Sequence, residues 1–533
     1  MNFGQLFFVI NIGLIVSIIN IFHVIIGYAR TLPGQVYMAT GHYYLDYFEY
    51  LQAISQGQHG QWLWENDYIT SVKIKTIFGM WQYLIFGKIG QLFHLSPIAT
   101  YWGANIILSV VLSVLIFFII KKILFNKPFY WQLAAYILAL FSAPFFKIVV
   151  SNNLKIIPYR FWDDQAVLIN RFSSVPYHIS AQIIVLLIIL ITADSLDKIV
   201  SLSKKVVIIR FVVIISLLFF LLSFSPASFL LVVFSLILTL IWLLFSKQFF
   251  SKIKFLGIIL FITFPLSLFM KIFYINKFFS DVSQTESSWQ IHPPLIFVFL
   301  TIGPILLFFW LGFKNYFRQL TTIKIIFFSF VFSSYLMFVS PIAFYLKTTN
   351  MRFLSPLNYI LLAVLTVVGI KKLKYLLIIC LTLLLLFIPG NIEGIRSQIN
   401  DPNLVSPISY LPKGIIDGFR YLDTLPGKQA VLTTPAQFLG MVAPIYSGKP
   451  VYLNRPGLYK YDQKIDMAAK FYWNIFSEDQ AKEFMNKNQI GFVVLTSIEG
   501  YPPNNLKNYK FLKEIYHNKD IVIYQDISLP KSL

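Results

Sequence analysis

Charged residues and cysteine are both scarce in this chain. Charged residues make up 13% of its 533 residues, whereas a soluble domain carries roughly 25%. The single cysteine, Cys380, lies within an apolar run, which excludes a disulfide framework and leaves the redox compartment open. Hydrophobic residues make up 57% of the chain. Together these shares exclude an ordinary soluble globular protein.

The motifs of nucleotide-driven and zinc-dependent chemistry are absent as well. The sequence contains no Walker loop, no dinucleotide fingerprint, no His-Glu-x-x-His site and no cysteine ligand pair. Nucleotide-driven transport therefore has no support in the sequence.

Acidic residues are few, and their distribution excludes nucleic acid as a partner. The chain has 23 Asp and Glu against 44 Lys and Arg, for a net charge of +21. From Asn391 onward, 16 basic residues face 13 acidic ones, a net charge of +3. The remaining +18 belongs to the first 390 residues, where it clusters in short loops. Such clustering is typical of membrane topology rather than of a nucleic-acid-binding face.

Long apolar runs are what the chain has in abundance. Crossing the hydrocarbon core takes about 20 apolar residues, and the first run lacks the basic n-region and cleavage site of a signal peptide. We therefore predict a polytopic α-helical membrane protein, with a turn at 223–226 that separates two spans. The eleven candidate spans lie at about 5–28, 99–120, 130–149, 179–193, 206–222, 226–245, 255–274, 294–313, 323–342, 355–370 and 373–389.

Loop charges predict the orientation. With the N-terminus in the cytoplasm, all five inner loops are basic, as the positive-inside rule expects. Eight of the ten acids before Asn391 then fall on the outer side. We therefore predict a multi-pass plasma-membrane protein whose C-terminal region is extracytoplasmic.

The first outer loop, 29–98, is too long for a simple connector, and such loops are usually functional. Its part 78–95 is apolar but contains Lys88 and several Gly and Gln residues, and a span there would reverse every later loop. We expect an interfacial helix with Trp81 and Tyr83 at the level of the headgroups.

The pattern changes near Asn391, where charge, proline and glycine increase. Short alternating runs predict strands at 429–433, 450–453, 491–496 and 521–524, and helices at 462–475 and 478–488, the second capped by Ser477. We therefore divide the chain into a membrane module, 1–390, and a soluble extracytoplasmic α/β domain, 391–533.

Two carboxylates in the first outer loop are the leading candidates for catalysis. Asp46 and Glu49 are the first acids in the chain, and their spacing of three puts both on one face of a helix. Aromatic residues surround them, which indicates a dehydrated site at the membrane boundary. A carboxylate there can act as a general base toward an acceptor hydroxyl, whereas the alternative is an ordinary solvated loop charge.

The segment Asp46-Tyr47-Phe48-Glu49-Tyr50 resembles the first outer loop of oligosaccharyltransferase catalytic subunits, which reads approximately Asp-Pro-Tyr-Phe-Asn-Tyr. Together with the multispan bundle and the terminal outer domain, it resembles the GT-C superfamily of integral-membrane glycosyltransferases, which includes the protein O-mannosyltransferases. The proline is missing and the segment is one residue shorter, so Asp46 keeps the base position while the alignment of Glu49 stays open. The resemblance implies a polyprenyl-phosphate-linked sugar donor, which fits the absence of nucleotide motifs.

The second outer loop supplies further candidates. The adjacent carboxylates Asp163 and Asp164 suit a hard divalent cation such as Mg²⁺ or Mn²⁺, or they position sugar hydroxyls of the substrate. The resemblance to oligosaccharyltransferases implies a metal in this loop, whereas other GT-C branches work without one. The alternative is a solvated helix terminus. Arg171 and His178 follow at the entry to the next span, where His178 is either a substrate contact or a hydrogen-bonded interfacial histidine.

Arg352 stands in the polar loop before the tenth span, at the outer boundary. Arg171 and Arg352 are candidate anchors for the carrier phosphate, because a guanidinium offers a bidentate donor. The alternative is an arginine that reaches the lipid headgroups. The Trp-Trp-Asp acceptor motif of oligosaccharyltransferases is absent, and Phe471-Tyr472-Trp473 is no equivalent, which argues against protein N-glycosylation.

The sequence thus favours a glycosyltransferase that moves a lipid-linked sugar to a glycan, lipid or protein acceptor on the outer face, with membrane lipids as its surroundings. The alternative is a non-catalytic membrane protein, such as a lipid-linked glycan flippase or transporter. A flippase should carry ionisable residues within its spans. Here the middle of each predicted span is free of ionisable residues except for His23, while acids gather in the outer loops.

Overall fold

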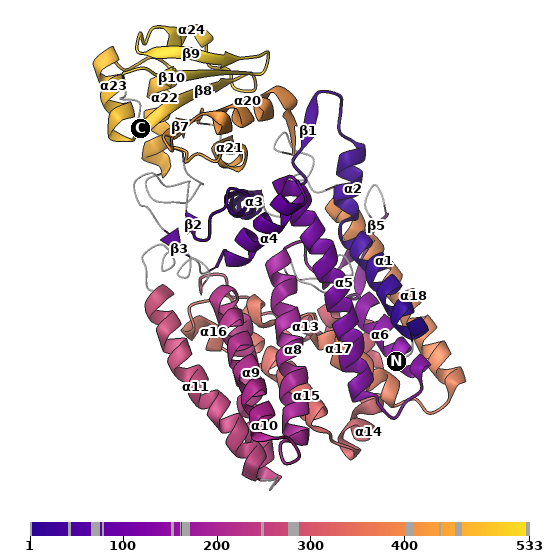
Figure 1. Ribbon diagram of the computed structural model, residues 1–533. Coiled ribbons are helices and arrows are strands. Elements are labelled where there is room, and N and C mark those ends of the chain that lie inside the picture. Colours follow the sequence, from indigo (N-terminus) through magenta and orange to yellow (C-terminus); the bar gives the residue numbers. More distant parts are fainter. Residues whose placement is uncertain are drawn as a thin grey trace. The chain divides into compact units, whose positions relative to one another are not determined.

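The computed structural model describes residues 3–40, 44–65, 75–76, 79–150, 154–159, 161, 171–246, 250–274, 287–400, 409–435, 439–453 and 461–528. The chain forms two compact units (Figure 1). Met1–Phe22 and Asn105–Ser397 form the first unit, and His23–Ala104 and Gln398–Leu533 form the second. The second unit therefore combines most of the first predicted outer loop with the C-terminal region.

The chain is a polytopic helical membrane protein, as predicted. Among the described residues, eight helices are long and apolar enough to cross a membrane. Three of the eleven predicted runs form shorter helices instead, α6 (Phe129–Phe141), α13 (Leu295–Ile302) and α17 (Asn358–Val368). The eight long helices are α1 (Phe3–Asn20), α5 (Pro97–Ile123), α8 (Pro176–Lys198), α9 (Lys204–Phe224), α10 (Pro226–Phe245), α11 (Phe250–Tyr274), α15 (Thr322–Val339) and α18 (Leu373–Ile399).

Polar side chains join the helices of the first unit. Asn20 of α1 donates a hydrogen bond to Asn105 of α5, at 3.1 Å, and both side chains are fully buried. Ser113 of α5 is hydrogen-bonded to the Tyr136 hydroxyl of α6. Such bonds hold helices together in a medium that offers no competing water. The predicted turn between two spans is confirmed, because α9 ends at Phe224 and α10 begins at Pro226.

The run predicted as a span at 294–313 is broken for a local reason. Gly303 has φ +93°, and a side chain there would meet the Ala143 carbonyl oxygen. Helix α13 therefore ends at this glycine. Short elements complete this unit: η1 (Pro304–Leu307), η2 (Phe309–Gly312), α14 (Phe313–Arg318), α16 (Ile342–Tyr345), η3 (Asn350–Phe353), and the hairpin of β4 (Phe146–Val150) and β5 (Leu154–Pro158).

The second unit contains a four-stranded sheet with the strand order β7-β8-β10-β9. Strands β7 (Ala430–Leu432) and β8 (Ile490–Thr496) are parallel, whereas β8 with β10 (Ile521–Asp526) and β10 with β9 (Leu512–His517) are antiparallel. Every residue of β8 is buried. Helices α22 (Tyr461–Tyr472) and α23 (Glu478–Lys487) contribute Phe471, Tyr472 and Phe484 to the core beside the sheet.

Most elements predicted in this region are confirmed. Strands β7, β8 and β10 and helices α22 and α23 lie where expected, and Ser477 caps α23 in a capping box. The expected strand at 450–453 amounts to one bridge, between Val431 and Val451. Two strands, β6 (Tyr410–Pro412) and β9, and three helices, α20 (Lys413–Thr424), α21 (Leu439–Ser447) and α24 (Pro503–Lys507), were not predicted.

The N-terminal part of the second unit carries the leading site candidates. It contains α2 (Phe22–Ala29), β1 (Gln35–Tyr37), α3 (Tyr44–Gln58), β2 (Trp64–Glu65), β3 (Lys75–Thr76) and α4 (Trp81–Leu92). Strand β1 pairs antiparallel with β6 (Tyr410–Pro412), which couples this part to the C-terminal region. At 12 residues, or about 18 Å, α4 is too short to span a bilayer.

Candidate functional site

Helix α3 carries both Asp46 and Glu49, and their spacing of three places both on one face of it. Asp46 lies in the first turn and is half-buried. Glu49 is only 7% exposed. A carboxylate in the first turn of a helix interacts favourably with the helix dipole. The two acids therefore share a helix face but differ in their access to a substrate.

Glycines lock α3 onto α4. A side chain at Gly87 of α4 would lie 2.1 Å from the Ile54 carbonyl oxygen of α3, and one at Gly57 of α3 would lie 2.2 Å from the Leu84 carbonyl oxygen of α4. The two backbones thus touch without intervening side chains. Such contact leaves α3 little freedom to slide along α4.

The C-terminal region of the second unit holds α3 from other directions. The Ser55 hydroxyl donates to the Ile445 carbonyl of α21 at 2.8 Å, and His59 Nε2 lies 3.1 Å from the Asp423 carboxylate of α20. On the segment that leads into α3, the Thr40 and Ser409 hydroxyls are hydrogen-bonded at 2.8 Å. The helix that carries the candidate base is therefore an integral part of this unit.

The aromatic residues near the acids are mostly packing residues. Tyr47 and Phe48 are fully buried, and the Tyr47 hydroxyl donates to the Met38 carbonyl at 2.9 Å. Tyr50 stacks on Tyr83 at 4.6 Å between ring centroids, and Tyr83 stacks on Tyr101 at 6.2 Å. The expectation that Tyr83 lies at the headgroups is wrong, because its ring is buried between α3 and α5.

A different face of α4 is exposed, and it is apolar. Ile85, Ile89, Leu92 and Phe93 are spaced by three or four residues and all are exposed. Lys88 Nζ lies 4.0 Å from the centroid of the exposed Trp62 ring. A soluble helix would present polar residues on its exposed side. The pattern of α4 is the reverse of that.

Helix α22 carries two side chains whose pKa values are shifted. Burial, and to a smaller extent an electrostatic interaction with Tyr44, raises the pKa of Tyr461 to about 12. One turn further on, Lys464 is 7% exposed and donates a hydrogen bond to the Tyr452 carbonyl at 3.0 Å. Burial lowers the pKa of this lysine to about 8.

The Phe471–Trp473 segment at the end of α22 has a structural role. The Tyr472 hydroxyl lies 3.0 and 2.6 Å from the carbonyl oxygens of Leu432 and Val494, within hydrogen-bond distance of both, and so ties α22 to β7 and β8.

In the first unit, Arg171 is deeply buried, with 2% exposure. Its guanidinium donates to the Ser142 carbonyl at the C-terminus of α6, where a positive charge interacts favourably with the helix dipole. Its Cζ lies 3.7 Å from the centroid of the Tyr359 ring, within range of a cation–π interaction. The geometry therefore gives Arg171 a clear packing role beside its predicted role as a phosphate anchor.

A buried polar network fixes the segment after Arg171. The side-chain amides of Asn20 and Asn105 both donate to the Ser173 carbonyl, at 2.9 and 3.3 Å. Ser173 has φ +63°, a strained value for a serine. Its hydroxyl lies 3.4 Å from Nδ1 of His178, whose ring meets the Tyr177 ring edge to face. The network thus positions both Arg171 and His178.

Arg352 is exposed and lies on η3, which hydrogen bonds hold in place. The Asn350 side-chain amide donates to the carbonyls of Ile291 and Phe338, at 2.6 and 2.8 Å. The Ser334 hydroxyl donates to the Phe353 carbonyl at 2.6 Å. An exposed arginine on a fixed support suits recognition of an anionic group.

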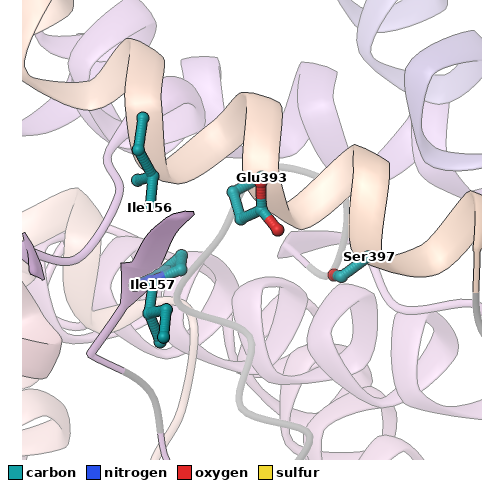
Figure 2. A pocket seen from close by; sticks show the side chains of 5 residues that line it. Ile156, Ile157, Glu393 and Ser397 are labelled. Carbon is teal, nitrogen blue, oxygen red and sulfur yellow. The ribbon is translucent and has the colours of Figure 1, made fainter. Parts of the chain in front are cut away.

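The structure leaves the predicted metal ligands untested. Asp163 and Asp164 lie outside the described residues, so the expected cation site stays a prediction. Within the described ranges, no three His, Cys, Asp or Glu side chains come together as metal ligands do. A shallow pocket of about 100 Å³ lies between the β4–β5 hairpin and α18, lined by Ile156, Ile157, Pro158, Glu393 and Ser397 (Figure 2). It contains none of the predicted site residues.

Sequence reasoning missed Asn20, Asn105 and Tyr359, the residues that support Arg171 and His178. The two asparagines stand within apolar runs, and polar residues inside spans usually pair with one another. The sequence therefore indicates that both asparagines have polar partners, but it does not identify these partners. The predicted residues fall in both units: Asp46 and Glu49 in the second, Arg171, His178 and Arg352 in the first.

No family model matches the sequence, and no curated protein is similar to it in sequence. Solved structures are similar in fold. The apo oligosaccharyltransferase of Archaeoglobus fulgidus matches with a TM-score of 0.52 at 11% identity, over 92% of this chain and 69% of that one. AglB of the same organism, in complex with an inhibitory peptide and a dolichol-phosphate, matches with 0.50 at 11% identity over the same shares.

A further structure of the Archaeoglobus fulgidus oligosaccharyltransferase, a complex with Zn and sulfate, matches with a TM-score of 0.50 at 12% identity. It covers 98% of this chain and 74% of that one. These likenesses extend over nearly all of the chain, so they concern its whole architecture. The chain has the fold of the oligosaccharyltransferases, which are integral-membrane proteins of the GT-C glycosyltransferase superfamily.

Proposed function

We propose that this chain is a GT-C glycosyltransferase that moves a sugar from a polyprenyl-phosphate-linked donor to an acceptor on the extracytoplasmic face of the membrane. The fold supports this function, because the matched AglB structure is a complex with a dolichol-phosphate and an inhibitory peptide. The acceptor is a glycan, a lipid or a protein.

Asp46 is the general base of this proposal. Its carboxylate accepts the proton of the acceptor nucleophile, the nucleophile bonds to the anomeric carbon, and the bond from that carbon to the phosphate oxygen breaks. The carrier phosphate leaves with its electron pair, and the anomeric configuration inverts. One observation supports Asp46 above the other acids: it is half-buried in the first turn of a helix fixed on several sides. A general base must be held in place in this way.

Glu49 has a different part. Its burial supports a role in holding α3 and the Asp46 carboxylate in position rather than direct contact with substrate.

The arginines bind the carrier phosphate in this proposal. Arg352 is exposed on a fixed support, and Arg171 presents a guanidinium held by the Ser142 carbonyl and the Tyr359 ring. Arg352 can form bidentate hydrogen bonds with phosphate oxygens from the surface. Arg171 is 2% exposed, so its part in the proposal requires that the carrier phosphate enter the protein beside the Ser142 carbonyl. Asp163 and Asp164 hold a divalent cation or position sugar hydroxyls, and His178 contributes a further contact.

The apolar face of α4 lies in the outer membrane interface. Helix α4 ends at Leu92 and the span α5 begins at Pro97, so the linking residues reach at most about 18 Å. An exposed row of Ile85, Ile89, Leu92 and Phe93 so close to a span suits insertion among lipids. Since α3 is locked onto α4, this insertion would set the height of Asp46 relative to the membrane.

A binding experiment separates the proposed roles. The chain is reconstituted in nanodiscs and equilibrated with a polyprenyl-phosphate-linked sugar. Asp46→Asn should bind the donor normally but fail to transfer the sugar, whereas Arg352→Gln should weaken donor binding. Normal donor binding by Arg352→Gln would remove Arg352 from the proposal, and transfer by Asp46→Asn at the wild-type rate would remove the base.

A further inference from the structure

A basic cluster at one end of the first unit surrounds a single carboxylate. It consists of Lys122, Lys198 and Arg210 around Asp194. Arg210 Nη1 lies 2.7 Å from Asp194 Oδ2, and the Nζ atoms of Lys198 and Lys122 lie 3.0 and 3.5 Å from Oδ1. The cations come from the last turns of α5 and α8 and the second turn of α9. One carboxylate leaves two positive charges without compensation.

The neighbouring charges increase this excess. Lys121 precedes Lys122 on α5, and Lys204 and Lys205 open α9. The other acid at this end of α8 is Asp197, which accepts a hydrogen bond from the Thr322 hydroxyl of α15. These helix ends thus carry more cations than the two carboxylates can neutralise. The excess positive charge at these helix ends attracts an external anion.

Apolar residues lie one helical turn deeper than two of the cations. Phe118 precedes Lys122 by four residues and is 39% exposed, and Val213 follows Arg210 by three residues and is 38% exposed. Residues three or four apart share a helix face. On both α5 and α9, therefore, a cation at the helix end is followed toward the middle of the span by an exposed apolar side chain.

We propose that the basic cluster binds the phosphate group of an anionic phospholipid, whose acyl chains run along Phe118 and Val213. Cations at the helix ends, with apolar side chains one turn closer to the middle of the membrane, suit an amphiphilic lipid better than a free anion. The basic character of these loops assigns the lipid to the cytoplasmic leaflet, where anionic lipids are attracted by juxtamembrane Lys and Arg. The inference does not depend on the proposed transferase activity.

The test compares thermal unfolding in nanodiscs of phosphatidylcholine with and without phosphatidylglycerol that has the same acyl chains. A lipid that binds the folded state should raise the unfolding temperature of the wild type by about 2 °C or more. The double variant Lys122→Gln, Arg210→Gln should lose that rise. Lys371→Gln, Lys372→Gln removes two cations from another loop and should keep it.

Asp194→Asn gives a second test, because it should increase the effect of phosphatidylglycerol on the unfolding temperature instead of removing it. It removes the internal anion and keeps the cations, so phosphatidylglycerol should raise its unfolding temperature more than that of the wild type. An equal rise in the wild type, the double variant and Asp194→Asn would overturn the proposal, because the effect would then be a general one of the bilayer. Inorganic phosphate added to phosphatidylcholine nanodiscs should have no comparable effect. A full rise with phosphate alone would overturn the assignment to a lipid.

Discussion

At the scale of single residues, side chains of one sequence motif can differ strongly in burial. Asp46 and Glu49 belong to one motif and one helix face, yet Asp46 is half-buried and Glu49 is almost fully enclosed. The spacing could predict the shared face because helical geometry alone sets it. It could not predict the difference in burial, since that depends on α4 and on residues of the C-terminal region more than 350 positions away.

Lys464 gives a pH-dependence that can be measured. Its pKa of about 8 is lower than that of a lysine in an unfolded chain, about 10.4. Between these two values the unfolded state binds more protons, so stability should rise with pH. From pH 8 to 9.5 the free energy of unfolding should rise by at most about 2 kcal/mol.

Hydrogen exchange of β8 amides, corrected for the intrinsic rate, reports the opening of the second unit in the complete chain. The free energy of this opening should rise between pH 8 and 9.5 in the wild type but not in Lys464→Met. Higher pH is avoided because burial raises the pKa of tyrosines such as Tyr461, which costs stability once the unfolded tyrosines ionise. The same slope in both proteins would contradict a depressed lysine pKa.

At the scale of elements, helices and strands with strong local patterns were predictable and their partners were not. The capping box of α23 and the apolar runs of β8 and α10 are local signals, and these elements lie where expected. Strand β9 alternates weakly and α21 contains Pro444, so neither has a clear local signature. The local pattern of α4 does not predict the burial of Tyr83, because its two stacking partners come from α3 and α5.

The contact between α3 and α4 predicts a large effect from a single methyl group. Gly87→Ala should push the two backbones apart and cost about 1–3 kcal/mol, with loss of transfer activity. Gly103 is a matched control, because it also lies in a helix but has nothing within 4 Å of an added side chain. Gly103→Ala should be neutral or slightly stabilising. Thermal unfolding of both variants decides the matter, and equal stabilities would mean that α3 and α4 are not locked together.

The exposed face of α4 predicts contact with lipid. A nitroxide on Leu92→Cys, in a Cys380→Ser background, should be relaxed more by oxygen, which partitions into the bilayer, than by a water-soluble nickel complex. A nitroxide on Asp479→Cys, at an exposed residue in the first turn of α23, serves as the aqueous control. Stronger relaxation of the Leu92 label by nickel would place α4 in water and contradict the interfacial position.

At the scale of the whole molecule, composition predicted the class of fold but not how distant segments combine. Apolar runs and loop charges were sufficient for a polytopic helical protein with a C-terminal α/β region. The join between residues 23–104 and 398–533 was not predictable, because β1 and β6 are three residues long and pair across nearly the full chain. The predicted boundary at 390–391 also falls within α18, which continues to Ile399.

The predicted orientation leads to a labelling experiment. In a Cys380→Ser background, a cysteine at the exposed Ser497 of the C-terminal region should react with a membrane-impermeant maleimide in intact cells. A cysteine at the exposed Ser201, in the loop between α8 and α9, should react only after permeabilisation. The reverse pattern would place the acidic loops in the cytoplasm and exclude an extracytoplasmic reaction.

The most direct test of the central claim is the rate of sugar transfer by the purified chain in nanodiscs, with radiolabelled polyprenyl-phosphate-linked sugars and lipid or glycan acceptors. The wild type should transfer, Asp46→Asn should be slower by about 10²- to 10⁴-fold, and the surface variant Asp466→Asn should be unaffected. Thermal unfolding confirms that each variant is folded. Equal transfer by Asp46→Asn and the wild type would show that Asp46 is not the base.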